Sequence, residues 1–164
     1  MIEFSNVSIN NDFDDYTKSP DIQKSTIQKF EDLREFYLID LEMMGTGNLY
    51  TNGSDLSTVG GIGNLAQALT HRLMTDRGTH PMDNTLGIPW SSYLGYSYAD
   101  SEVIKYELIQ EVVSELYKDT RVEDIKDITL EFIDLNTVSI NLTVTPVGTD
   151  RVVNIGLDVK EVGD

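Results

Sequence analysis

The stretch LTHRLMTDRGTHPMDNTLGIPW, residues 69–90, concentrates the unusual residues of this chain. It contains both histidines, the only tryptophan and two of the four prolines. Such a density indicates either a chemically active site or a loop whose backbone course is fixed by turn-forming residues. Leu69 and Leu73 recur at helical spacing, and Gly78 and Gly87 follow in a run of turn residues. The first prediction is therefore a helix that ends in a structured loop.

Composition and charge narrow the class of protein. The 164 residues fit one domain with an appended arm, and 40% hydrophobic and 24% charged residues are ordinary for a globular chain. With 28 acidic against 12 basic residues the net charge is -16, which disfavours nucleic acid and membrane surfaces as partners. The absence of cysteine excludes disulfides and thiolate chemistry. The amino terminus lacks the features of a secretory signal, so we expect synthesis in the cytoplasm without one.

The pattern of apolar residues predicts an α+β fold: a small antiparallel or mixed sheet packed against two main helices, with an N-terminal arm and helix. Asn64 followed by Gln67 is a variant of the capping box, and Asp100 or Ser101 is a suitable cap for the second main helix. The expected order is an arm (1–18), a helix (20–34), a strand (36–43), a turn at Asn52-Gly53, a helix (64–75), a helix ending near Lys118, and strands around 128–132, 138–144 and 153–159.

A metal site is one interpretation of the two histidines. His71 and His80, with Asp76 or Asp83, are residue types that bind zinc, but their spacing matches no metal motif. We favour solvated or turn-capping histidines and expect no metal or cofactor.

Catalysis by carboxylates has little support in the sequence. Glu107, Glu111 and Glu115 fall on one helix face, where their repulsion indicates a solvated surface or a contact with a basic partner. There is no Gly-x-Ser-x-Gly motif for a nucleophilic serine. We expect Trp90 to pack a long loop onto the core, and at least one of Tyr93, Tyr96 and Tyr98 to lie in an interface.

Two motifs carry a resemblance to a known family. Leu73-Met74-Thr75, then Gly78-Thr79 and the run from Asp83 to Gly87, resemble the helix end and loop of baseplate wedge proteins of contractile phage tails. This is the GPW or gene-twenty-five-like family, also called sheath initiators. Its short Glu-Pro-Arg signature after the long helix corresponds here to Asp119-Thr120-Arg121. The order of motifs over about 36–160 is similar to the family, and the continuation Ile88-Pro89-Trp90 resembles members from tailed phages and defective prophages of Gram-positive hosts.

The resemblance implies a structural role in the virion. Family members lie in the inner baseplate around the tail tube, usually in six copies, and start sheath assembly by strand addition with sheath subunits. Expected partners are the sheath protein, other wedge proteins and tube or hub proteins. We expect a wedge domain over 36–164, preceded by an N-terminal arm and helix over 1–35 whose arm has no counterpart in the family. Residues given structural or interface roles are Gly78, Pro81, Asp83, Gly87, Trp90, Asp119, Thr120 and Arg121.

Two other functions stay open on the sequence. The first is a peptidoglycan hydrolase, because the family has carried a lysozyme label and glycoside hydrolysis needs only a suitable pair of carboxylates. The second is a small acidic adaptor that binds a basic protein, and its binding would weaken steeply with salt.

Overall fold

The computed structural model describes residues 1–10, 39–43, 48–53, 55–95 and 102–161. The helix expected over 20–34, the caps expected at Asp100 and Ser101, and two of the tyrosines, Tyr96 and Tyr98, lie outside these residues. The elements are β1 (Ile2–Asn10), β2 (Ile39–Leu41), β3 (Thr51–Asn52), β4 (Asp55–Leu56), β5 (Thr58–Gly60), α2 (Gly61–Leu73), the 3-10 helix η1 (Trp90–Ser92), α3 (Glu102–Leu116), β6 (Val122–Asp134), β7 (Thr137–Pro146) and β8 (Val153–Glu161).

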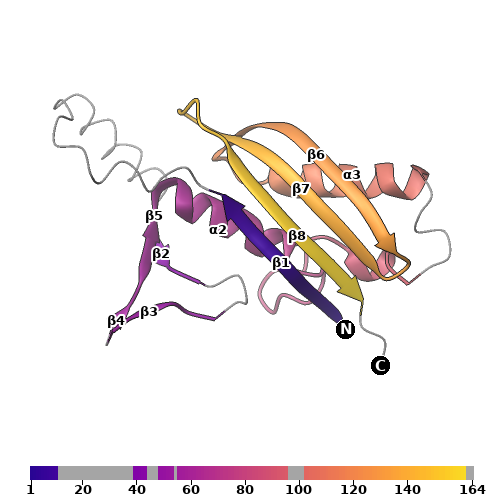
Figure 1. Ribbon diagram of the computed structural model, residues 1–164, viewed down its shortest axis with the longest axis horizontal. Coiled ribbons are helices and arrows are strands. Elements are labelled where there is room, and N and C mark those ends of the chain that lie inside the picture. The colour runs from indigo at the N-terminus through magenta and orange to yellow at the C-terminus, as the bar shows by residue number, and fades with distance from the viewer. Residues whose placement is uncertain (11–38, 44–47, 54, 96–101, 162–164) are drawn as a thin grey trace.

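A four-stranded antiparallel sheet, in the order β1-β8-β7-β6, forms the body of the protein. Both α2 and α3 lie on one face of it (Figure 1). The three predicted C-terminal strands are confirmed, and their alternating residues supply the sheet side of the core. The buried residues of the two central strands, at most 2% exposed, are Val138, Ile140, Leu142, Val144, Val153, Ile155, Leu157 and Val159.

Helix α3 presents the expected apolar stripe to this core. Leu108, Val112 and Leu116 are fully buried, as their four-residue spacing predicts. The helix ends at Leu116, two residues before the predicted end at Lys118. Together with the sheet and α2, this confirms the α+β class.

Helix α2 begins earlier than the sequence indicated, and the predicted capping box is wrong. The N-cap is Gly60, which makes no side-chain cap, and Gly61 turns the chain into the helix at φ 62°. Gln67 is buried, and its side chain bonds to the chain at β2 instead. Its Nε2 donates to the Leu41 carbonyl and its Oε1 accepts from the Met43 amide, both at 2.8 Å. A side chain that ties α2 to the chain at β2 cannot also cap its own helix.

Two short ribbons extend from the N-terminal end of α2 (Figure 1). In the first, β2 pairs with β5, so the strand expected over 36–43 is confirmed over Ile39–Leu41, while residues 36–38 lie outside the described residues. In the second, β3 pairs with β4 across a turn in which Gly53 has φ 71°, as the Asn52-Gly53 signal predicted. No described helix is long and apolar enough to span a membrane.

Candidate functional site

The loop after α2 closes on itself through backbone contacts. The Ile88 amide donates to the Thr75 carbonyl at 3.0 Å, and the Arg77 amide donates to the Ile88 carbonyl at 2.9 Å. Gly87, directly before Ile88, has φ 93°, and a Cβ there would overlap the backbone of Thr75. Only glycine fits this position, so the opening stretch of the sequence fixes a backbone course.

The tip of this loop is a capped turn. The Asp83 amide donates to Nδ1 of His80 at 3.1 Å, which confirms His80 as a turn-capping residue. Oδ1 of Asp83 in turn accepts from the hydroxyl of Thr85 at 2.7 Å and from its amide at 2.9 Å. The hydroxyl bond is the main cause that lowers the pKa of Asp83. Pro81 lies exposed in the bend, and Gly78 precedes it at φ 91°.

The far end of the loop is anchored in the core by Trp90. Its side chain is fully buried, and its indole Nε1 donates to the carbonyl of Leu73 at the end of α2, at 2.8 Å. Ile88 is also fully buried. Packing is therefore the confirmed role of Trp90, and its N–H satisfies a carbonyl that the helix end leaves without an intrahelical partner.

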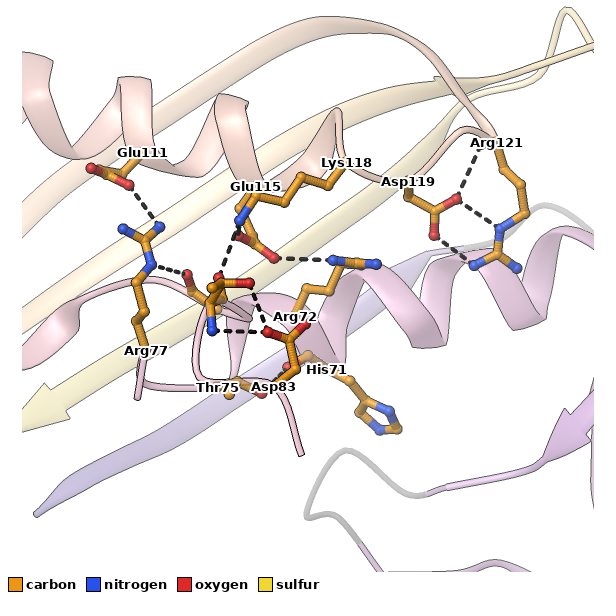
Figure 2. A network of polar contacts seen from close by, with 12 residues as sticks. His71, Arg72, Thr75, Arg77, Asp83, Glu111, Glu115, Lys118, Asp119 and Arg121 are labelled. Carbon is orange, nitrogen blue, oxygen red and sulfur yellow. Dashed lines mark hydrogen bonds and ion pairs between the residues drawn. The ribbon is translucent and has the colours of Figure 1, made fainter. Parts of the chain in front are cut away.

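A cluster of charged side chains joins the two helices and the loop (Figure 2). At its centre is Glu115, which is 0% exposed. Oε1 of Glu115 accepts from Arg72 of α2 at 3.0 Å, and Oε2 accepts from Lys118 at 2.6 Å. Lys118 also donates to the carbonyl of Thr85 in the loop at 3.1 Å. The prediction of a solvated surface is therefore wrong for Glu115, because this carboxylate is compensated by two cations.

A second ion pair fixes the near side of the loop. Arg77 donates through one terminal nitrogen to Oε2 of Glu111 at 2.7 Å and through Nε to the carbonyl of Gly87 at 3.0 Å. Both side chains are about one-third exposed, at 30% and 34%. Beside them lies Tyr93, whose pKa is raised by burial and then by the charges of Glu111 and Glu107.

Asp119 and Arg121 form a local clamp where α3 gives way to β6, seen at the edge of Figure 2. Arg121 donates to both carboxylate oxygens of Asp119, at 2.8 and 2.6 Å, and its amide donates at 3.1 Å. Burial alone raises the pKa of Asp119, but the hydrogen bonds and charge of Arg121 outweigh burial and lower it. The Arg121 carbonyl then accepts from the Val147 amide at 2.9 Å, while Thr120 stays exposed.

His71 and His80 line one open groove of about 500 Å³, together with Asp40 and Leu86. Burial lowers the pKa of His71, with the nearby charge of Asp40 opposing it. Among the described residues no group of three histidine, aspartate or glutamate side chains is arranged to hold a metal ion.

The residues that sequence reasoning missed are the cationic partners and the buried amide, Arg72, Arg77, Lys118 and Gln67. Residues 61–98 carry two acids and two bases, and the two bases are Arg72 and Arg77. Glu111 and Glu115 are spaced one helical turn apart. That spacing hinted at a shared face for ion pairs, but the sequence does not tell which helix packs on which.

These contacts define a structural α+β domain in which polar side chains hold two helices and a loop on one face of a sheet. The chain belongs to the sheath initiators of contractile injection systems: the family model described as "Contractile injection system sheath initiator" matches residues 37–148. The match confirms the resemblance to this family, and it points to a structural component of a tail baseplate. No curated protein matches the chain.

Proposed function

We propose that this protein nucleates sheath assembly by β-strand addition between its four-stranded sheet and the first sheath subunits. The observation that carries the proposal is an antiparallel sheet, in a member of the sheath initiator family, whose central strands are buried on one face and whose outer strands β1 and β6 each pair with one strand within the described residues. Main-chain hydrogen bonds at such an edge supply affinity, and alternating side chains supply specificity.

The proposed place of the protein is the baseplate wedge around the tail tube, with six copies meeting the sheath, other wedge proteins and tube or hub proteins. Residues 1–35 are proposed as an arm and helix, and 36–164 as the wedge domain. The role is structural rather than enzymatic. Glu115 and Glu111, the most enclosed acids of α3, are each engaged by an arginine, which suits a structural role better than proton transfer.

The proposed contact with a neighbouring baseplate subunit lies at Thr120. Its side chain is exposed between Asp119 and Arg121, whose mutual clamp presents it at a rigid corner. Thr120→Arg adds bulk and charge there without touching the core. We expect the variant to fold normally and to lose incorporation into particles, whereas Gln110→Arg at an exposed position of α3 serves as a control.

Deletion of the gene from its phage or prophage tests the main proposal. We expect negative-stain electron microscopy to show naked tubes or unjoined heads. Complete, contractile tails would remove the sheath-initiator role. In that case a salt titration of binding to a basic partner and a zymogram separate the acidic adaptor from the hydrolase.

A further inference from the structure

Among the described strands, β1 occupies one edge of the sheet and pairs with β8 alone. It pairs antiparallel with β8 from Ile2 opposite Glu161 to Asn10 opposite Asn154. The ladder is interrupted between Ser5 and Ser8, where Asn6 takes the left-handed φ of 51°. A non-glycine residue with positive φ and a broken ladder both weaken a strand.

The apolar side of β1 covers the core only in part. Ile2, Phe4 and Val7 pack against the buried cluster but stay half-buried, and Ile9 is 38% exposed. The alternate residues of β8 beneath them are at most 2% exposed. A polar bond from Nδ2 of Asn6 to Asp158, at 2.6 Å, supplements the ladder. β8 is therefore an integral core strand, whereas β1 covers its edge with side chains that are only half-buried or exposed.

The opposite edge, β6, carries the features that natural sheets use against strand addition. Its ladder with β7 has three irregularities, between Val122 and Asp124, between Ile125 and Asp127, and between Phe132 and Asp134. Bulges and charges along an edge hinder pairing with another chain. The charged residues of β6 are Glu123, Asp124, Lys126, Asp127, Glu131 and Asp134.

The position of β1 at the start of the chain allows it to separate from the sheet. It precedes residues 11–38, so it can separate from β8 without disturbing the order of β6, β7 and β8. It also lies outside residues 37–148, the part of the chain that the sheath initiator model matches. Strand β8 lies beyond the matched residues as well, so the match includes β6 and β7 but neither β1 nor β8.

We infer that β1 is an intramolecular cap on the strand-accepting edge of β8, and that an incoming strand of a sheath subunit must displace it. This inference rests on the proposed function. The capped state keeps the edge of β8 closed in the free protein, since an open, regular edge recruits other chains indiscriminately. Displacement then confines strand addition to a partner that pairs better than β1.

The strand that replaces β1 has a defined chemistry. It runs antiparallel to β8 and places apolar side chains over Ile155, Leu157 and Val159, where β1 places half-buried ones. A regular strand without the interruption at Ser5 to Ser8 completes the hydrogen bonds that β1 leaves unmade. On the outer face, a basic residue opposite Asp158 matches the negative charge of this protein better than Asn6 does.

A reversible disulfide tests the inference, because the chain has no cysteine of its own. Glu3 and Lys160 are directly opposed, exposed partners in the β1–β8 ladder, so Glu3→Cys with Lys160→Cys locks the cap when oxidised. The matched control is Glu131→Cys with Ser139→Cys, an opposed pair that joins β6 to β7 and leaves β1 free to separate from β8. Binding of a purified sheath subunit is measured by interferometry for both variants, oxidised and reduced.

We expect the oxidised cap variant to bind at least about tenfold more weakly than the same molecule after reduction, and the control to bind equally in both states. A thermal scan should show the oxidised cap variant folded and no less stable than the reduced form. Equal binding by the locked and reduced cap variant overturns the inference and leaves the proposed function standing. Disulfide-linked dimers instead of monomers also overturn it, because β1 would then cap a second copy. A failure of the reduced variant, the control and the unmodified protein alike to bind refutes strand addition, and the cap with it.

Discussion

Glu115 of α3 is completely buried and accepts a hydrogen bond from Arg72 of α2 at 3.0 Å. Arg72 is 26% exposed and Lys118, the second partner, 43% exposed. The carboxylate is therefore shielded from water, whereas the two cations that compensate its charge remain partly hydrated. Removing one partner of a buried ion pair leaves the charge of the other uncompensated. We therefore expect the contact between Glu115 and Arg72 to stabilise the packing of the two helices more than the exposed ion pairs do.

Replacing Glu115 should therefore destabilise the fold more than replacing Glu111. We expect Glu115→Gln to lower the free energy of unfolding by about 1–3 kcal/mol, since an amide cannot compensate Arg72 and Lys118. Glu111→Gln, at a partly exposed pair, should cost less than about 1 kcal/mol. Urea denaturation of both variants measures the difference. Equal losses would mean that Glu115 is hydrated in solution.

Gly87 and Gly78 offer a matched pair for the loop. Both have φ near 90°, but a Cβ at Gly87 overlaps the Thr75 backbone whereas one at Gly78 meets nothing within 4 Å. Gly78→Ala should cost only the backbone strain, about 1–2 kcal/mol. Gly87→Ala adds a steric clash, so we expect a larger loss and displacement of the Ile88 amide from Thr75. Chemical denaturation measures the loss of stability, and the NMR resonance of the Ile88 amide reports its displacement. Similar losses of unfolding free energy in both variants would contradict the clash.

Gln67 should hold the β2 ribbon to α2. Gln67→Leu keeps the size of the side chain but removes both 2.8 Å bonds to Leu41 and Met43. We expect faster hydrogen exchange at the Met43 amide, with a local loss of about 1–3 kcal/mol, while amides of β7 keep their protection. Gln110→Leu on α3 is the control. Unchanged exchange at Met43 would show that the ribbon is held by its strand pairing with β5 alone.

Acid should weaken the clamp between Asp119 and Arg121. Because the pKa of Asp119 is lowered in the folded protein, the stability it contributes is present above the ordinary value of 3.8 and is lost as the pH falls through the folded pKa. Asp119→Asn removes this contribution, so its unfolding free energy should fall less steeply with acid than that of the unmodified protein below about pH 4. Thermal scans from pH 6 to pH 3 measure the slopes, with Asp150→Asn, an exposed acid in the β7–β8 turn, as the control.

Local sequence patterns predicted the main strands, the long helix and one turn of this protein. The alternation in Val138 to Val144 and in Val153 to Val159 can bury one face only as strands, and the stripe of Leu108, Val112 and Leu116 can do so only as a helix. The turn at Gly53 and the family motifs are equally local, because each depends on residues a few positions apart.

The tertiary structure decided what depends on distant partners. The local sequence around Gln67 predicts a helix cap, but its side-chain amide instead bonds to the chain at β2. The spacing of Glu115 predicts a solvated acid, but Arg72 from another helix compensates its charge and allows it to be buried. The pairing of β1 with β8 joins the first strand of the chain to the last, and no local pattern specifies such a partner. Periodicity tells which face of an element is apolar, whereas burial and pairing are set by the elements that meet that face in space.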